Sequence, residues 1–310
     1  MIAYTLRRVL QMPLVLVVVA SLTFVLVRLA PGGPFDRERR LAPEIERNLA
    51  RTCELDAPVE AQLVRFLRGL VTSDVDGCTG YSLKYPGRTV REVLTDAFPV
   101  SVHLGALALL FALVIGFFTG LVAAMRQGSL VDRLAMTVST IGISVPSFVL
   151  GPLFVLVFSL WLGWLPPALW SGPSTWILPA ITLGSAYAAY VSRLTRAGML
   201  EIVHEDFMRT ARAKGLPRHI VVLRHGLRGG LLPLVTYLGP ATSSLFTGSV
   251  VVEQIFGIPG LGRVFIESAL SRDYNVVLGC VLLYAAFLLA MNLVVDLVYG
   301  FLDPRVRIDQ

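Results

Sequence analysis

The uncharged apolar stretches of this chain constrain its fold more than any other feature of the sequence. About 20 apolar residues in a helix cross the hydrocarbon core of a bilayer, and a charge near the centre of that core costs a few kcal/mol. Five stretches of about this length or longer contain no Asp, Glu, Lys or Arg: Val9–Val27, Ala97–Met125, Leu134–Ser192, Gly229–Val252 and Tyr274–Val295. The sequence therefore predicts an all-α integral membrane protein.

The longest stretch, Leu134–Ser192, has room for two spans. Its segment Gly163–Pro173 (GWLPPALWSGP) is rich in Gly and Pro, which break helices. Dividing the stretch there gives six transmembrane helices, with both termini on the same side. A cleavable signal peptide with Leu14–Ala20 as its apolar part is the weaker alternative, because the whole apolar run is too long and no A-x-A-like site precedes Pro31.

Basic residues in the short loops predict which side is cytoplasmic, because cytoplasmic loops carry the excess of Lys and Arg. On one side the short loops contain only Arg263 and Arg272. On the other side they contain Arg7, Arg8, Arg126, Arg133, eight basic residues from Arg193 to Arg228, Arg305 and Arg307. We therefore expect both termini to be cytoplasmic.

This topology divides the chain into four parts. They are residues 1–30, the cytoplasmic N-terminus and first helix; 31–96, a small extracytoplasmic helical insertion; 97–303, the transmembrane core with a cytoplasmic loop at 193–228; and 304–310, a cytoplasmic tail. The insertion carries ten basic residues, but a translocated loop longer than about 60 residues escapes the positive-inside rule.

The insertion contains an amphipathic run, Val59–Leu70, that predicts a helix. It also contains Cys53 and Cys78, in a compartment where disulfides persist. A bond between them and a pair of free or packed thiols are both open alternatives.

The net charge of +6 comes almost entirely from arginine, because Lys84 and Lys214 are the only lysines. A Walker A site needs Gly-Lys-Ser/Thr, and these lysines precede Tyr85 and Gly215. If ATP is involved, another subunit must bind it. The chain also lacks C-x-x-C and a His pair at ligand spacing, so we expect no metal site, no bound cofactor and no catalytic residue.

The loop from Arg193 to Arg228 predicts two short helices. His204–Ala213 has an acidic first turn, which the helix dipole favours, and Gly215 would end that helix. Pro217 would begin the second helix, with apolar residues following at helical spacing. This arrangement would form a docking surface on the membrane face, although on composition alone a solvated basic loop is an equal alternative.

Several short motifs give this loop a closer parallel. Arg209–Leu216 (RTARAKGL), with Arg224-His225 and Leu232-Pro233 after it, resembles the EAA loop of ABC-importer permeases in the dipeptide and oligopeptide branch, above all their B-type subunits. The segments Arg28–Gly32, Gln254–Gly262 and Arg272–Tyr274 resemble the same branch, so the likeness covers essentially the whole chain.

The resemblance implies the type I importer fold of six helices and a bacterial inner-membrane location. It also implies a second related permease subunit, two ATPase subunits that carry ATP and Mg, an extracytoplasmic peptide-binding protein and no nucleic acid. The implied coupling loop comprises Asp206, Arg209, Thr210, Ala211, Arg212, Ala213, Lys214, Gly215 and Leu216, and the implied extracytoplasmic loop comprises Glu253, Gly257, Pro259, Gly260 and Gly262.

Three residues are the strongest candidates for docking. Arg209 would pair with an acid on the ATPase, Ala211 would permit close approach, and Gly215 would provide the turn. The sequence departs from the general pattern because Arg209 to Ala211 stand where Glu-Ala-Ala begins. Gly226, Gly229 and Gly230 also replace bulkier helix formers, which puts the rigidity of the second helix in doubt.

Polar and small residues within the spans give further expectations. His103 would make a hydrogen bond near the interface, and Asp296 would tie its helix to an arginine near the cytoplasmic face. Gly116 and Gly120 form a small-xxx-small pattern for close helix contact. Substrate contacts stay unassigned, since one sequence does not tell which face of a helix lines a pathway.

Three other functions compete with peptide import. An importer of nickel chelates or glutathione has a similar permease. A self-contained secondary transporter would need buried ion sites or inverted repeats, which the spans do not display. A membrane-embedded enzyme would need a catalytic constellation, and the four histidines are scattered.

Overall fold

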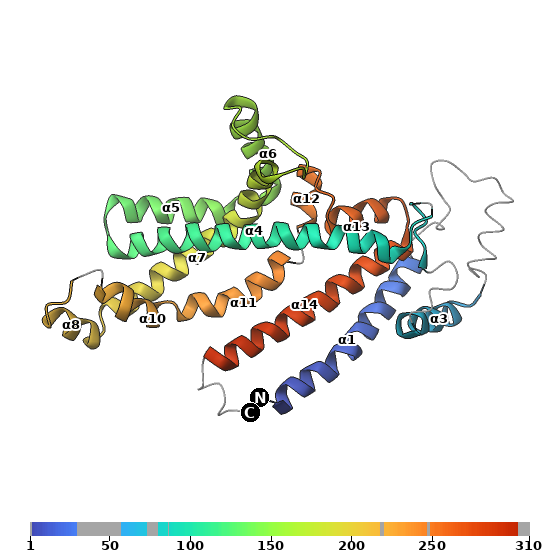
Figure 1. Cartoon of the computed structure of the whole chain (residues 1–310), viewed down its shortest axis with the longest axis horizontal. Coiled ribbons are helices and arrows are strands. Elements are labelled where there is room, and N and C mark those ends of the chain that lie inside the picture. The colour runs from blue at the N-terminus through green and yellow to red at the C-terminus, as the bar shows by residue number, and fades with distance from the viewer. Residues whose placement is uncertain are drawn as a thin grey trace. The chain divides into compact units, whose positions relative to one another are not determined.

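The computed structural model describes residues 2–29, 57–72, 80–85, 87–217, 220–246 and 249–302, and these form helices and one isolated bridge between Tyr81 and Thr89 (Figure 1). The helices are α1 (Ile2–Leu29), α3 (Val59–Thr72), α4 (Val90–Met125), α5 (Leu130–Ser144), α6 (Ser147–Phe154), α7 (Pro173–Val203), α8 (Asp206–Ala213), α10 (Leu227–Gly230), α11 (Leu232–Phe246), α12 (Val250–Phe256), α13 (Leu261–Leu270) and α14 (Tyr274–Leu302), with the π-helical segments η2 (Val155–Trp161) and η3 (Val221–Gly226). The expected all-α class is confirmed for these residues. Cys53, Cys78 and the tail 304–310 lie outside them.

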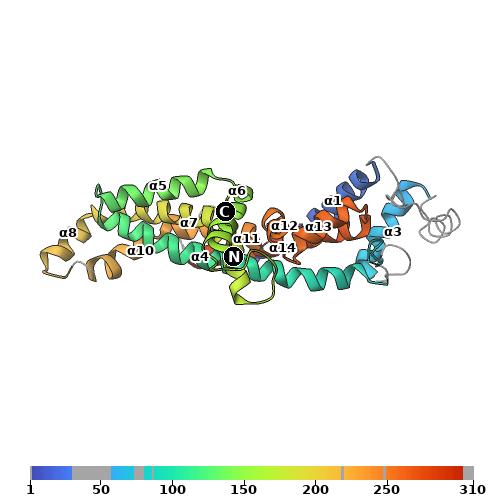
Figure 2. The same cartoon turned by 90° about the horizontal axis from the view of Figure 1, so that it is seen from above.

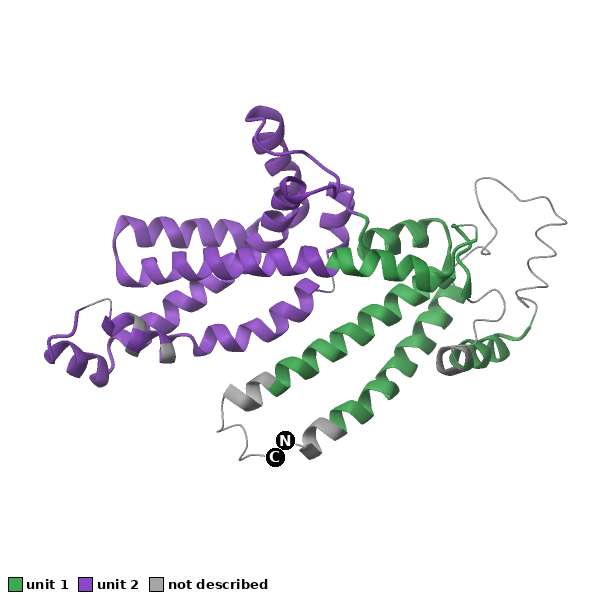
Figure 3. Cartoon of the chain, viewed as in Figure 1, with its two compact units in different colours: residues 1–101, 259–310 green, residues 102–258 purple. Residues whose placement is uncertain are grey.

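The chain forms two compact units, residues 1–101 with 259–310 and residues 102–258 (Figure 3). In the first unit α1 packs against α14, and Arg8 on α1 pairs with Asp296 on α14 at 3.2 Å. The expected pairing of Asp296 with an arginine is therefore confirmed. The helix α3, which the amphipathic pattern predicted, contacts α1 through stacked Phe24 and Phe66 rings.

In the second unit α5, α6 and α11 all pack against α7, and Figure 2 shows α5 beside α7 from a second direction. The segment of α4 in this unit approaches α7 closely at two glycines. A Cβ at Gly116 would lie 2.5 Å from the Ala188 carbonyl oxygen, and one at Gly120 would overlap the Ser192 carbonyl. The predicted small-xxx-small contact is confirmed, since only glycine permits this backbone approach.

Apolar side chains face outward along the long helices. Leu14 and Leu26 on α1 are each 66% exposed, and Val138 on α5 is 67% exposed. Water would penalise such a surface, whereas lipid tails match it. Among the described residues α1 from Arg7, α4 and α14 to Leu297 are long and apolar enough to cross a membrane.

The stretch Leu134–Ser192 contains two helical parts, as expected from the sequence, but the first part is bent. Its helices α5 and α6–η2 meet at an angle of 110°. Pro146 explains the bend: the residue before a proline is disfavoured in the α region, and Val145 is extended at φ −88° and ψ 119°. The expected breaker Gly163–Pro173 does separate η2 from α7, which then continues past Ser192 to Val203.

The stretch Gly229–Val252 is likewise not one continuous helix. It comprises the end of α10, then α11, which ends at Phe246, and then the start of α12 at Val250. Since α11 has 15 residues, it falls short of the roughly 20 that a perpendicular span requires. Because of this interruption, α11 alone is too short to cross a membrane as a straight, perpendicular helix.

Candidate functional site

The predicted first helix of the loop is present as α8. Its first turn contains Asp206 and its last turn contains Arg212, which suits the helix dipole. Gly215 follows with φ +76°, a conformation that glycine adopts without strain, so the predicted turn is confirmed. Arg212 donates a hydrogen bond from Nη2 to the Val203 carbonyl at 3.0 Å, which ties α8 to the end of α7.

The inner face of α8 packs within the chain. Met208 is fully buried and Ala211 is 7% exposed, and both contact Val221, with Ile202 and Val203 beside them. This corrects the expectation for Ala211, because its side chain faces its own chain. Its small size permits α8 to approach η3.

The outer face of α8 is open to a partner. Asp206 and Arg209 are highly exposed and lie 3.6 Å apart, and Phe207 is 48% exposed. The half-exposed ring beside two charged side chains offers apolar surface and charge that a partner could bind. Phe207 was not among the docking residues expected from the sequence, although an aromatic residue on the polar face of an amphipathic helix can indicate a contact with a partner.

The glycines of the second helical piece lock it against α7. A Cβ at Gly198 would overlap the Gly230 carbonyl oxygen, and a Cβ at Gly229 would lie 2.8 Å from Ile202 Cδ1. Gly226 lies against the methyl ends of Met199 and Met208. The glycines had put the rigidity of the second helix in doubt, and in the structure they permit it to pack closely against α7.

A buried ion pair holds the same end of α7 to the α4–α5 turn. Arg196 donates from Nε and Nη2 to the two Asp132 oxygens at 2.6 and 2.8 Å, and the Gly128 N–H donates to Asp132 at 2.9 Å. Asp132 is only 3% exposed. A two-point, planar contact of this kind fixes orientation as well as distance. We name Asp132, Arg196 and the Gly128 amide the α5–α7 clamp.

The expected extracytoplasmic loop falls into two parts, one in each unit. In the second unit α12 ends at Gly257, which has φ +63°, and the Ile258 N–H donates to the Glu253 carbonyl at 2.9 Å. Glu253 is fully buried, so its side chain is not on an open surface. Gly257 therefore forms a tight left-handed turn at the end of α12.

In the first unit Gly260 precedes α13, and the Leu261 N–H donates to the Ser101 hydroxyl at 2.8 Å. Pro259 lies just before this helix start, and Gly262 is buried inside its first turn. The loop residues are therefore anchored to the first unit by a buried polar contact.

A polar cluster fastens the segment before α4 to α13 and α14. Glu267 accepts from Lys84 Nζ and Arg263 Nε, each at 2.7 Å, and from Tyr85 OH at 3.2 Å. The hydrogen bond from Lys84 holds the pKa of Glu267 down, to about 2, against the opposing effect of burial and with the help of Arg263. Ser82 and the Lys84 N–H bind the buried carboxylate of Asp273. This cluster was not predicted from the sequence, because Lys84 and Tyr85 lie 183 and 182 residues before Glu267 in the chain.

Aromatic residues within the second unit pair with one another. His103 contacts the edges of Trp170 and Trp176, with ring centroids at 5.5 and 4.5 Å, in place of the expected hydrogen bond. The ring centroids of Tyr190 and Tyr237 lie 5.6 Å apart.

Comparisons with known proteins agree over the whole chain. Residues 112–308 match the family described as binding-protein-dependent transport system inner membrane component, and residues 1–105 match the N-terminal family of the same membrane components. The oligopeptide transport system permease protein OppB of Haemophilus influenzae is 40% identical over 99% of this chain and 100% of its own length.

Two further relatives are nearly as similar. The dipeptide transport system permease protein DppB of Bacillus subtilis is 38% identical over 99% of both chains. The glutathione transport system permease protein GsiC of Escherichia coli is 37% identical, also over 99% of both chains.

Solved structures support the fold. An amino acid ABC transporter chain is similar with a TM-score of 0.55 and 17% identity, over 68% of this chain and 94% of that one. A chain of the MetNI methionine ABC transporter in an inward-facing conformation has a TM-score of 0.52 and 18% identity, over 67% and 97%. At these identities the likeness concerns the fold alone.

Proposed function

This chain belongs to the family of binding-protein-dependent transport system inner membrane components, and from that premise we propose that it forms half of the pathway through which an ABC importer takes up oligopeptides. The chain is a non-catalytic integral membrane permease. Full-length similarity to permeases named for oligopeptide and dipeptide transport supports the substrate class.

The outer face of α8 carries the mechanistic part of the proposal. Phe207, Asp206 and Arg209 project from a short helix whose other face is fixed to η3 and α7. We propose that this face enters a cleft of an ATPase subunit, with Phe207 desolvated and Arg209 beside an acidic group of that subunit. The residues Thr210 to Leu216 complete the loop, and Gly215 sets its turn.

The α5–α7 clamp and the glycine contacts of α7 would carry the motion. When the ATPases close, α8 would move with them, and a packed interface passes such a displacement on because it has few intermediate arrangements. Because α8 is tied to α7 and α7 is tied to α5, the bent helix α5–α6 would follow. ATP and Mg would be bound by the ATPase subunits only.

The topology remains part of the proposal. We propose α1, α4, α5–η2, α7, the interrupted segment from α10 to α12, and α14 as the six spans, with both termini cytoplasmic and residues 31–96 outside the inner membrane. The loop would face the extracytoplasmic peptide-binding protein through Gly257 and Pro259, while the buried Glu253, Gly260 and Gly262 would support it from within. The partners would be that protein, one related permease and two ATPases, and the bond between Cys53 and Cys78 stays a prediction.

Uptake of glutathione is a second candidate substrate, because GsiC matches over the same length. Its lower identity makes it the weaker choice. Competition between peptides of different length and glutathione for the purified binding protein separates the two.

Co-purification through a tag on this chain tests the assembly. We expect a second permease and two ATPases in the purified complex, and ATP-dependent peptide uptake after reconstitution with the binding protein. If the chain purified alone and transported in liposomes without ATP, the proposed subunit role would be wrong.

A further inference from the structure

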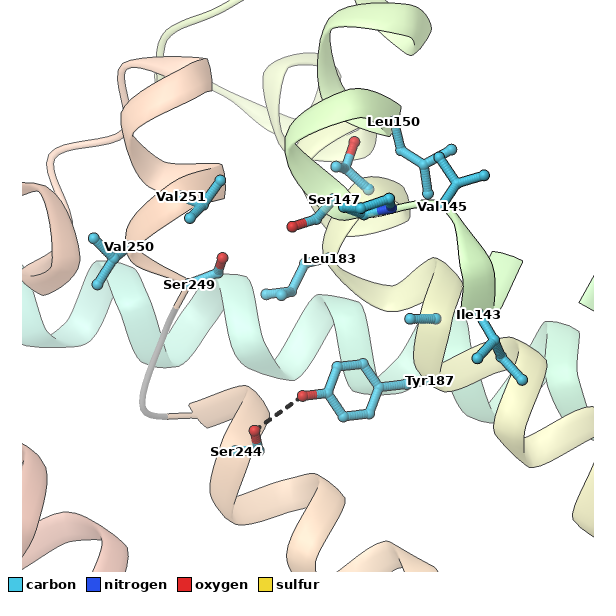
Figure 4. Close-up of a pocket in the computed structure, with 13 residues that line it drawn as sticks. Ile143, Val145, Ser147, Leu150, Leu183, Tyr187, Ser244, Ser249, Val250 and Val251 are labelled. Atoms are coloured by element: carbon cyan, nitrogen blue, oxygen red, sulfur yellow. Dashed lines mark hydrogen bonds between the residues drawn. The ribbon is translucent and has the colours of Figure 1, made fainter. Parts of the chain in front are cut away.

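The second unit contains a cavity of about 440 Å³ between two interrupted helices and one continuous helix (Figure 4). One wall is the break between α5 and α6 at Val145 and Pro146. Another is the end of α11 with the start of α12 after Ser249, and α7 provides the third through Leu183 and Tyr187. Its volume lies in the range of ligand sites, roughly 300–1,000 Å³.

The cavity lining is polar but uncharged among the described residues. Five hydroxyl groups line it, from Ser147, Thr182, Tyr187, Ser244 and Ser249, and the other described lining residues are apolar. Figure 4 shows Ser147 on α6, Ser249 ahead of α12 and Leu183 on α7 around the same space. The Tyr187 hydroxyl donates to Ser244 at 3.0 Å, which closes the side toward α11.

The backbone adds further polar groups. A helix end leaves N–H and C=O groups without partners inside the helix, and within a bilayer such groups are tolerated only against protein or a polar cavity. Here the break at Pro146 and the break before Val250 border the same cavity. At these breaks the Val252 N–H donates to the Ser249 hydroxyl at 3.2 Å and the Val149 N–H donates to the Pro146 carbonyl at 2.9 Å. A hydroxyl group can make more than one hydrogen bond, so the five hydroxyl groups suit a polar molecule in the space better than lipid.

We propose that this cavity is a station on the translocation path that holds a short peptide by its amide groups and does not select for side-chain charge. Hydroxyl groups both donate to and accept from amides, and the apolar lining residues accommodate side chains. Because none of the described lining residues is charged, neither cationic nor anionic residues are held tightly, and a transported molecule must be able to leave. The inference rests on the proposed import of peptides.

Opposite charges placed at Ser147 test this assignment. The complete transporter is reconstituted with Ser147→Asp or Ser147→Arg, and uptake of tripeptides with a central Ala, Glu or Lys is measured with saturating loaded binding protein. We expect Ser147→Asp to reduce uptake of the Glu peptide about tenfold more than uptake of the Lys peptide, and Ser147→Arg to reverse the order. Equal effects of either variant on all three peptides would overturn the assignment.

A nearly isosteric variant keeps the test independent of assembly defects. Ser147→Cys should react with a small thiol reagent, and a saturating transported tripeptide should slow that reaction about fivefold by occupying the cavity. Gln127→Cys, exposed in the turn between α4 and α5, is the control and should react at the same rate with or without peptide. A reaction rate in Ser147→Cys that peptide leaves unchanged would mean that peptide does not occupy the cavity.

Uptake by the wild-type transporter distinguishes a failure of the proposed peptide import from a failure of the role proposed for the cavity. Failure of wild type to import any of the three tripeptides would contradict the proposed function, and with it the station. Normal import by wild type together with insensitive Ser147 variants would contradict the station alone and would favour a partner helix as the occupant of the cavity.

Discussion

Glu267 shows how a single residue can hold together distant parts of the first unit. Its carboxylate accepts hydrogen bonds from Arg263 on the same helix and from Lys84 and Tyr85, which lie in a segment distant in the sequence. The i,i+4 spacing on α13 predicts the contact with Arg263, but no local pattern predicts the contacts with Lys84 and Tyr85. Asp296, by contrast, could be predicted, because a carboxylate within an apolar span needs a cation and arginines flank the cytoplasmic ends.

The Glu267 cluster predicts a pH-dependent stability. The pKa of Glu267 falls from its ordinary value near 4.5 to about 2 in the folded protein, so its stabilising effect is present above pH 4.5 and is lost as the pH falls toward 2. At pH 7 we expect Glu267→Gln to lower the free energy of unfolding by about 1–3 kcal/mol, and the difference from wild type to shrink at pH 3. Thermal unfolding of the purified complex between pH 7 and 3 measures it.

Glu60→Gln is the control for this prediction, because Glu60 is exposed on α3. It should leave the unfolding temperature unchanged at each pH. Equal losses in the two variants, or a loss at Glu267 that does not change with pH, would contradict the assigned ion pairs.

At the scale of elements, the sequence predicted the helices best where local signals were strong. The helix α8, its acidic first turn and the stop at Gly215 all follow from local chemistry. The bend at Val145–Pro146 also had a local signal in its proline, but uniform apolar composition concealed it. The fit of Gly198 against Gly230 depends on two helices meeting, which one sequence does not reveal.

The α5–α7 clamp makes a prediction about coupling between elements. Removing one charge of a buried pair leaves the other without compensation and costs about 3–5 kcal/mol. We expect Asp132→Asn to insert into the membrane but to lower the number of peptides imported per ATP hydrolysed, because α7 would no longer move α5. Reconstituted transport and hydrolysis measured together test this ratio.

The exposed pair Arg88–Asp96 provides the matched control, since breaking a surface pair costs at most about 1 kcal/mol. Arg88→Gln should leave the ratio unchanged. The exchanged double variant Asp132→Arg with Arg196→Asp should regain part of the coupling. An unaltered ratio in Asp132→Asn would show that the clamp does not transmit motion.

At the scale of the whole molecule, composition and charge placed the chain in a membrane, and the motifs placed it in its family. The number of spans was harder to predict because the π-helical segments and the breaks at Val145–Pro146 and at Ser249 replace uniform helices. Such interruptions are the regions where a transporter lines its pathway, so the departures from the simplest helix pattern coincide with the cavity.

The topology makes a prediction of its own. A cysteine introduced at Glu60 on α3 should react with a membrane-impermeant thiol reagent in intact cells after the outer membrane is permeabilised. A cysteine introduced at Gln127, exposed in the turn between α4 and α5, should react only after the inner membrane is opened. Reaction of both positions from the same side would contradict the proposed orientation.

The central claim is that this chain has no ATPase site of its own and takes up motion through the outer face of α8. The most direct measurement is ATP hydrolysis by the reconstituted complex with and without loaded binding protein, in wild type, Phe207→Leu and Phe207→Glu. We predict that binding protein stimulates hydrolysis in wild type and in Phe207→Leu. In Phe207→Glu the stimulation should be at least about tenfold smaller, because a carboxylate would replace the ring that the ATPase cleft covers. Full stimulation and full peptide uptake in Phe207→Glu would contradict the claim.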